Sequence, residues 1–116
     1  MKQPDDPTRA GHILDAAETI QRWIDGKSRA EFDADEVLQS AVAYQLQIIG
    51  EAASRLSAEF RRANPTIPWH DVIGMRHILV HAYERVAMDI VWTVATERLA
   101  ALIDVVRPHA PPLEEE

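Results

Sequence analysis

Residues 36–60 form the stretch that decides the fold, EVLQSAVAYQLQIIGEAASRLSAEF. Apolar side chains recur along it at helical spacing, which predicts one long helix of about seven turns. The expected buried stripe is Leu38, Val42, Ile49, Ala52, Ala53, Leu56 and Phe60. Asp33 and Glu36 stand at capping-box spacing before it, and Phe32 and Val37 stand at the spacing of a hydrophobic staple. A glycine inside a helix costs about 1 kcal/mol against alanine, so Gly50 indicates either a closely packed neighbour or neutral drift.

Three further helices are expected around this stretch. The first begins at Pro7 with Asp6 as its cap and stops at Gly26. The segment ANPTIPWH, residues 63–70, interrupts the helical pattern, and Pro68 then starts the third helix. The fourth runs from about residue 86 to 106, with one apolar face made of Met88, Val91, Trp92, Ala95, Leu99, Leu102 and Val106. These elements predict an all-α, up-and-down four-helix bundle over residues 7–106, between a flexible N-terminus (1–6) and a flexible acidic tail (107–116).

Composition limits the classes of function that are open to this chain. Its 116 residues suffice for one domain, and the absence of cysteine excludes disulfides, thiolate metal sites and thiol nucleophiles. A net charge of −7 is unfavourable for general nucleic-acid binding. Ten of the twelve basic residues are arginines, which suit forked recognition of phosphate in a local groove. With no basic-then-apolar leader and no apolar run of membrane-spanning length, we expect a cytoplasmic protein without membrane contact.

The third helix carries an unusual set of polar residues in MRHILVHAYER, residues 75–85. On an α-helical wheel the core-facing arc contains Val72, Met75, Ile78, Leu79 and Ala82. Arg76, His77 and His81 lie on the opposite arc, and Tyr83 lies close to Arg76. Two apolar residues, Ile73 and Val80, are interleaved among them. Such a mixture is typical of a face that meets another surface, so we predict that Ile73 and Val80 lie in a dimer face.

Each of these polar residues also has an ordinary structural interpretation. An arginine on a polar face is usually solvated or salt-bridged, and a tyrosine near a helix end is usually half-buried. His77 and His81, with His70 as a distant third ligand, could be a metal pair, but no carboxylate completes an obvious ligand set. We therefore predict no metal and no cofactor. The convergence of the four residues favours a site.

The chemistry that these residue types support is cleavage of RNA. RNA carries its own nucleophile, the 2′-hydroxyl, so cleavage needs a base, an acid and stabilisation of phosphorane charge. Arg76 offers a permanently charged fork for phosphate, and His81 has a near-neutral reference pKa suited to proton transfer. One histidine cannot comfortably serve as base and acid in the same turnover. A two-fold dimer with this face at its centre would supply a second copy of each residue.

The sequence resembles the HepT-like branch of the HEPN superfamily, small helical toxins paired with minimal nucleotidyltransferase antitoxins. Arg76, His81 and Tyr83 reproduce the family pattern R-x4-H-x-Y. The segments IPWHDVIGMRHILVHAY (67–83) and IIGEAASRLS (48–57) match the surroundings of the motif and the second-helix signature. The resemblance covers roughly residues 8–106.

This resemblance implies a HEPN-like homodimer with the motif faces apposed and a metal-independent endoribonuclease activity carried by Arg76 and His81. It implies further that a cognate nucleotidyltransferase antitoxin silences the toxin by AMPylation of Tyr83. His77 stands where family members often have asparagine and would be a supporting polar residue. Glu51 and Arg55, one helical turn apart, either border the cleft or form an ordinary surface ion pair.

Two other functions remain open at this point. The chain could be a non-catalytic HEPN module that binds a nucleotide or a partner, with Arg76 holding one phosphate. It could also be a dimeric scaffold for an antitoxin, in which case Arg76 and His81 would tolerate alanine in every assay except stability. Dependence of RNA cleavage on both residues without divalent metal distinguishes the ribonuclease from both.

Overall fold

The structure, a computed structural model, describes residues 5–81 and 85–112, with side chains at all of these positions except 79–81, 85 and 86. All regular structure within these ranges is helical, which confirms the all-α class. The elements are α1 (Asp6–Ile24), α2 (Arg29–Asp33), α3 (Glu36–Ser54), α4 (Ala58–Ala63), α5 (Trp69–Gly74), the 3₁₀ helix η1 (Met75–His81), α6 (Arg85–Glu97), α7 (Leu99–Val106) and the 3₁₀ helix η2 (Arg107–His109). None of the helices described is long and apolar enough to span a membrane.

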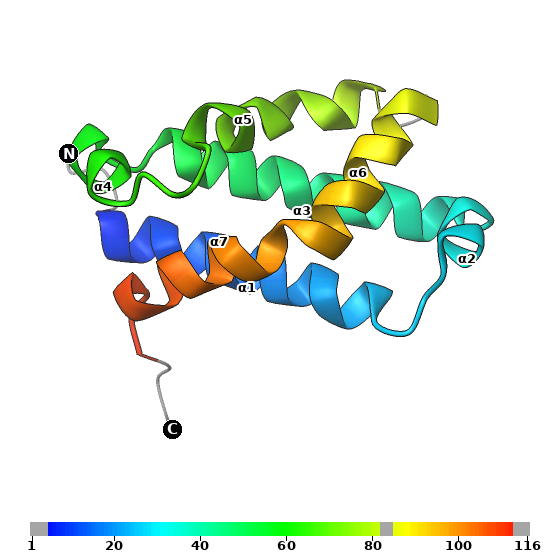
Figure 1. Cartoon of the computed structure of the whole chain (residues 1–116), viewed down its shortest axis with the longest axis horizontal. Helices are drawn as coiled ribbons and strands as arrows, with labels where there is room; N and C mark the ends of the chain where they lie inside the picture. The colour runs from blue at the N-terminus through cyan, green and yellow to red at the C-terminus, as the bar shows by residue number, and fades with distance from the viewer. Residues whose placement is uncertain (1–4, 82–84, 113–116) are drawn as a thin grey trace.

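The bundle consists of four helical segments, which we call legs, and consecutive legs run in opposite directions (Figure 1). The long helices α1 and α3 are the first two legs and pack against each other. The third leg, α5 followed by η1, lies along α3, and the fourth, α6 followed by α7, returns to pack on α1. The short helices α2 and α4 lie at opposite ends of the molecule (Figure 1). The predicted up-and-down four-helix bundle is confirmed.

The core follows from the apolar stripes of these legs. Every buried residue among the described side chains is apolar. The stripe expected on the fourth leg is confirmed, with Trp92 partly buried and the other six positions buried. The expected stripe on residues 36–60 is also buried, except that Leu38 is only partly so. Polar side chains are thereby confined to the surface, where they can meet a ligand.

The expected start of the second helix is wrong. Asp33 is the last residue of a separate short helix, α2, whose true cap is Ser28 in a capping box with Glu31. Asp35 caps α3, with its Oδ1 accepting a hydrogen bond from the Leu38 amide at 3.0 Å. Val37 is 80% exposed and forms no staple. Asp33 and Asp35 both suit the cap position. Because Asp33 belongs to α2, Asp35 is the residue that reaches the amides of α3.

The second leg is also shorter than expected. Helix α3 ends at Ser54, and Ser57 caps the separate helix α4, which carries Phe60. The Ser57 amide and hydroxyl donate to Asp6 Oδ1 and Oδ2 at 2.8 and 2.6 Å. Asp6 is thus occupied by α4, and Asp5 caps α1 in its place by accepting from the Thr8 amide at 3.1 Å. Gly26 follows the end of α1, the first leg, as expected, with a φ of 74° that favours glycine.

The third and fourth legs each change geometry partway. Pro68, expected to start the third helix, stands at the N-cap position of α5, one residue before its first residue. The α-helix ends at Gly74 and continues as η1, with three residues per turn. The arcs expected from an α-helical wheel therefore do not hold beyond Gly74. The fourth leg is interrupted at Arg98, between α6 and α7.

Helical contacts continue past residue 106, where the expected bundle ends. Arg107 and His109 belong to η2. Arg107 Nη2 lies 2.8 Å from Glu18 Oε2 on α1, and the His109 ring packs edge-on against Phe60 at a centroid distance of 4.8 Å.

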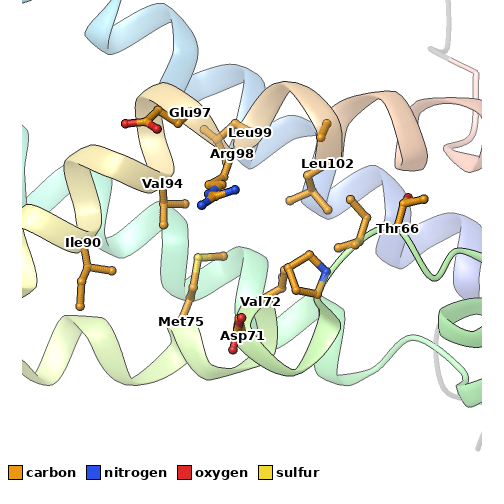
Figure 2. A pocket seen from close by; sticks show the side chains of 13 residues that line it. Thr66, Asp71, Val72, Met75, Ile90, Val94, Glu97, Arg98, Leu99 and Leu102 are labelled. Carbon is orange, nitrogen blue, oxygen red and sulfur yellow. The ribbon is translucent and has the colours of Figure 1, made fainter.

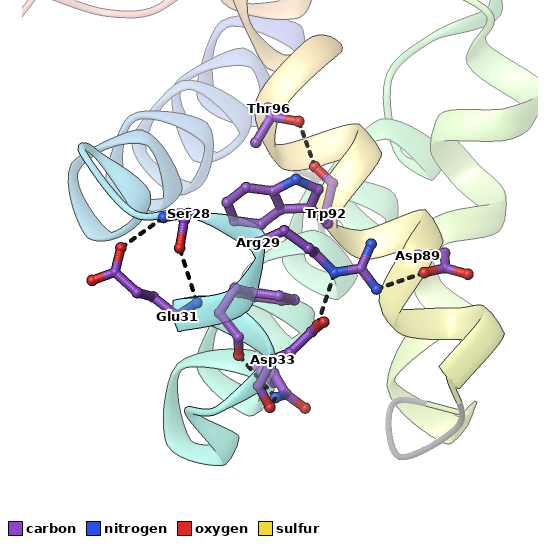
Figure 3. Close-up of polar contacts among 9 residues, drawn as sticks. Ser28, Arg29, Glu31, Asp33, Asp89, Trp92 and Thr96 are labelled. Atoms are coloured by element: carbon purple, nitrogen blue, oxygen red, sulfur yellow. Dashed lines mark hydrogen bonds and ion pairs between the residues drawn. The ribbon is translucent and has the colours of Figure 1, made fainter.

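A contact between α2 and α6 closes the end of the bundle where α6 begins (Figure 3). The Phe32 and Trp92 rings lie 5.1 Å apart in a tilted arrangement. Arg29 spans the surface above them, with Nε 2.8 Å from Asp33 Oδ1 and Nη2 2.5 Å from Asp89 Oδ1. These carboxylates raise the pKa of the Arg29 guanidinium. The contact attaches α6, the helix that follows the motif, to α2, the short helix that precedes the second leg.

Candidate functional site

Arg76 is fixed by its backbone against α3. A Cβ added at Gly50 would lie 2.8 Å from the Arg76 amide nitrogen and 3.1 Å from the Ile73 carbonyl oxygen. Such distances leave no room for a side chain at position 50, so the two backbones approach closely at this point. Of the two interpretations of Gly50, the structure supports the closely packed neighbour. That neighbour is the arginine of the motif itself.

Glu51 holds the side chain of Arg76 loosely. Glu51 Oε1 accepts from Arg55 Nε at 3.1 Å, and Glu51 Oε2 lies 3.8 Å from Arg76 Nη1. We call these three residues the Glu51 cluster. The Arg76 side chain is 39% exposed and that of Glu51 50%, so solvent screens the longer contact. A phosphate could therefore displace the carboxylate from Arg76 at small cost.

The ion pair expected between Glu51 and Arg55 is present, and it lies directly beside Arg76. Both arginines contact one carboxylate, and the formal charges of these three side chains sum to one positive charge in a chain of net charge −7. Local positive charge in a planar, forked form is what recognition of a single phosphate requires.

The other predicted site residues are placed less completely. His77 is exposed, one residue after Arg76 on η1. Ile73 is partly buried and packs against the core of its own chain, so only part of its side chain faces outward. The side chains of Val80 and His81 lie outside the described residues, although their backbone belongs to η1. Tyr83 lies outside the described residues altogether.

A pocket that includes several polar residues adjoins the Glu51 cluster. This pocket, the α1–α3 pocket, has a volume of about 280 Å³ and is lined by Arg9, His12, Tyr44, Gln47, Ile48, Glu51 and Ala52. Glu51 is therefore a wall shared by the pocket and the cluster. Arg9, His12 and Tyr44 are not among the site residues predicted from the sequence. The sequence signal for these residues is weak. An exposed tyrosine such as Tyr44, or two basic residues three positions apart such as Arg9 and His12, are common on the helices of a bundle.

A larger pocket of about 490 Å³ lies between α5 and the last leg (Figure 2). Apolar side chains such as Met75, Val94 and Leu102 line it, and Arg98 points into it. Neither Arg76 nor His77 is among the residues that line it. Asp71, Glu97 and Arg98 also line it, but no described residue of the motif does, so it is not the site that the motif predicts.

The described residues contain no group of three or more histidine, aspartate or glutamate side chains placed to hold a metal ion. His70 and His77 therefore do not belong to a metal centre within this part of the chain. What the described arrangement provides is a fixed arginine, a displaceable carboxylate and an adjoining polar pocket. These features suit a phosphate group with chain extending from it.

Comparison with known proteins identifies relatives of this chain. The family model described as Ribonuclease HepT-like matches residues 13–108. A protein named "Putative RNase" from Caldanaerobacter subterraneus is 36% identical over 78% of this chain and 81% of its own length. "Probable ribonuclease HepT" from Thermococcus cleftensis is 34% identical over 78% of this chain and 82% of its own length.

A longer relative from Methanocaldococcus jannaschii, named "Gamma-glutamylcyclotransferase and putative RNase", is 35% identical over 78% of this chain, and the match spans only 41% of that protein. No solved structure matches the chain significantly. The matched family range contains α3, η1 and the last leg, and hence the Glu51 cluster and the motif arginine. The chain belongs to the HepT-like ribonuclease family.

Proposed function

We propose that this protein is a metal-independent endoribonuclease in which Arg76 and His81 carry the chemistry at a composite site between two copies of the chain. The observation that carries the proposal is the state of Arg76. Its backbone is held against Gly50, and the one ion pair of its guanidinium among the described side chains is with a carboxylate 3.8 Å away. A fixed cation with a displaceable partner is suited to bind the scissile phosphate and to stabilise the charge of a phosphorane.

The reaction is transfer of the phosphoryl group within the RNA. His81 of one protomer accepts the proton of the 2′-hydroxyl as its oxygen attacks the adjacent phosphorus. The bond from phosphorus to the 5′-oxygen breaks, and His81 of the two-fold related copy donates a proton to that oxygen. The products are a 2′,3′-cyclic phosphate and a free 5′-hydroxyl. His77 would lie beside the phosphate as a supporting polar residue.

The two copies would meet through the face that contains Ile73 and Val80. A two-fold axis through this face places the motif of one copy opposite that of the other. The homodimer thus supplies the second histidine that the reaction needs. We place the protein in the cytoplasm, where its RNA substrate is found.

In the cell the chain would act as the toxin of a toxin–antitoxin pair. A cognate minimal nucleotidyltransferase antitoxin would transfer AMP to the Tyr83 hydroxyl. The added phosphate carries negative charge and bulk into the neighbourhood of Arg76, where it would compete with the RNA phosphate for the guanidinium. AMPylation would therefore silence the toxin through the same cation that binds the substrate.

The test is cleavage of a mixed single-stranded RNA in EDTA by wild type and by His81→Ala, after intact mass has shown that Tyr83 is unmodified. We expect cleavage by wild type alone, with 2′,3′-cyclic phosphate ends. His70→Ala is the matched control, because His70 is an exposed histidine on α5 and lies outside the motif. Equal activity of wild type and His81→Ala would remove His81 from the mechanism.

A second candidate is a non-catalytic module that binds a nucleotide or partner. The net charge of −7 favours it, since a single phosphate site needs only the positive charge of the Glu51 cluster. Saturable nucleotide binding that requires Arg76, without RNA turnover by unmodified wild type, would establish this function instead.

A further inference from the structure

The α1–α3 pocket and the Glu51 cluster are two parts of one continuous surface, because Glu51 belongs to both. On one side of Glu51 lies Arg76 on η1, and on the other lie Arg9 and Tyr44. A chain that places one phosphate on Arg76 can therefore extend past Glu51 into the pocket. This continuity raises the question of which ligand the pocket fits.

The pocket contains the group types that recognise single-stranded nucleic acid. Tyr44 is 54% exposed, which is high for a large aromatic ring on a helix facing another helix. Exposed aromatic rings beside arginines stack unpaired bases. Arg9 lines the same pocket with a positive charge, and His12, one turn further along α1, is exposed there. The aromatic ring and the basic side chains come from two different helices and face the same volume.

Arg9 and Gln47, which line this pocket, each contain one buried polar atom without a partner among the described residues. Arg9 Nε and Gln47 Oε1 are both buried, and neither makes a hydrogen bond within the described residues. A buried donor or acceptor without a partner is costly, so such atoms usually acquire one from water or a ligand. The edge of a nucleobase carries a donor and an acceptor side by side. A base that stacked on Tyr44 could supply both when the two side chains turn toward it.

We propose that the α1–α3 pocket binds one nucleotide of single-stranded RNA next to the scissile phosphate, with Tyr44 stacking on the base and Arg9 contacting the base edge or its phosphate. This inference rests on the proposed ribonuclease function for the position of the scissile phosphate. A volume of about 280 Å³ lies just below the range of small-molecule sites, roughly 300–1,000 Å³. It fits one nucleotide and excludes a duplex, so the pocket would select unpaired RNA.

The test is binding of a fluorescent RNA oligonucleotide with 2′-O-methyl groups throughout, which removes the nucleophile, measured by anisotropy. We expect Tyr44→Ala to raise the Kd about tenfold, in line with the loss of one base–aromatic stack. Tyr44→Phe keeps the ring and should stay within about twofold of wild type. Arg9→Gln should weaken binding and lower the slope of log Kd against log salt by about 0.7.

Matched controls exist on the same two helices. Val37→Ala removes an exposed apolar side chain from α3, seven residues before Tyr44. Arg22→Gln removes the same charge as Arg9→Gln at the far end of α1, about 20 Å away along the helix. Both controls should bind as wild type does. Because Tyr44 is exposed, its replacement leaves the core intact, which thermal unfolding will verify.

The outcomes separate this inference from the ribonuclease itself. Cleavage by wild type, with Tyr44→Ala binding as tightly as Val37→Ala, would overturn the nucleotide pocket alone. Tyr44-dependent binding without cleavage would support the pocket and overturn the nuclease. No binding of the oligonucleotide by wild type would overturn the pocket. Unchanged RNA binding with an altered sedimentation coefficient in Tyr44→Ala would also overturn it, since Tyr44 would then be a protein contact.

Discussion

Two contacts hold the motif segment from opposite sides, and they are built differently. Before the motif, η1 packs on α3 beside the buried Met75, and the two backbones approach closely at Gly50. After the motif, α6 is attached to α2 through an aromatic pair and the ion pairs of Arg29. The first contact fixes a position by leaving no space. The second fixes it by burying apolar area beneath charges that remain exposed.

The first contact therefore serves to position Arg76, and the second serves to stabilise the fold. The close approach at Gly50 fixes where the Arg76 backbone stands, because a Cβ added at Gly50 would lie 2.8 Å from the Arg76 amide nitrogen. The Phe32–Trp92 contact buries a whole ring and contributes more free energy, while its geometry can shift without harm to the reacting groups. We therefore expect substitutions at α2–α6 to affect stability most, and substitutions at Gly50 to affect activity beyond their cost in stability.

The largest expected effect is that of Phe32→Ala. Phe32 is fully buried and contacts Trp92, so its truncation leaves a cavity and should lower the free energy of unfolding by about 3–5 kcal/mol. That is a large share of the roughly 5–15 kcal/mol typical of a domain. Urea unfolding followed by circular dichroism measures it. Val37→Ala, an exposed apolar truncation nearby in the chain, should cost less than about 0.5 kcal/mol. A loss below about 1 kcal/mol for Phe32→Ala would show that this contact is not the stronger one.

Gly50→Ala tests the backbone contact. The added methyl would meet the Arg76 amide at 2.8 Å, so η1 must move away from α3. Overpacking of this kind costs about 1–3 kcal/mol, partly offset by about 1 kcal/mol of helix propensity. We expect the unfolding free energy to fall modestly and RNA cleavage to fall at least tenfold, because Arg76 is displaced from its phosphate.

Gly74→Ala is the matched control for this prediction. Gly74 ends α5, and a Cβ there would meet nothing within 4 Å. The same substitution should be neutral or slightly stabilising, and cleavage should be unchanged. If Gly50→Ala behaved as Gly74→Ala does, the close approach of η1 to α3 would not position the arginine.

The sequence predicted the parts of this fold that depend on periodicity. Apolar spacing was sufficient for the four legs and for most of the core, because burial of a stripe needs only the right period. Gly50 indicated a closely packed neighbour, since a glycine inside a helix is unfavourable unless another element approaches it closely. What it could not reveal was its partner, because a contact between residues 50 and 76 depends on how two helices pack.

Element ends were predicted less well, because neighbouring groups compete for the same hydrogen bonds. Asp33 and Asp35 both suit a cap, and only the turn after α2 decides between them. The change from α5 to η1 has no signal in the apolar pattern, since spacings of three and four residues fit both helix types over a short span. At the site, Arg76 and Glu51 could be anticipated from one helix each. The pocket that contains Arg9 and Tyr44 requires two helices to be placed side by side.

A smaller effect is expected from Ser28→Ala at the cap of α2. Ser28 Oγ accepts from the Glu31 amide at 3.1 Å, and the Ser28 amide donates to Glu31 Oε1 at 2.9 Å. Loss of the cap should cost about 1 kcal/mol. The hydrogen bonds from the Ser28 backbone and side chain lower the pKa of Glu31. The contribution of these hydrogen bonds to the free energy of unfolding is therefore fully present above the ordinary pKa of a glutamate. It is lost as the pH falls through the lowered pKa of Glu31.

Chemical denaturation of wild type and Ser28→Ala at several pH values checks this sign. The difference in unfolding free energy should be largest near neutral pH and should shrink in acid. The Glu31 pKa, followed by NMR, should lie below that of an ordinary glutamate in wild type and rise in Ser28→Ala. A difference that grew as the pH fell would contradict the capping box as the cause.

The smallest effect belongs to the exposed charges of the α2–α6 contact. Asp89→Asn removes one of the two carboxylates that pair with Arg29; the Asp89 side chain is exposed and that of Arg29 is partly exposed. Exposed ion pairs contribute about 0–1 kcal/mol and are screened by salt. We expect a loss below about 1 kcal/mol that vanishes in 1 M NaCl, whereas the cost of Phe32→Ala should persist there. Asp104→Asn, an exposed carboxylate on α7 without an ion pair among the described side chains, is the control for charge alone. A salt-independent loss in Asp89→Asn would mean that the aspartate holds α6 by geometry, and the division between a precise contact and a strong one would no longer fall between the two sides of the motif.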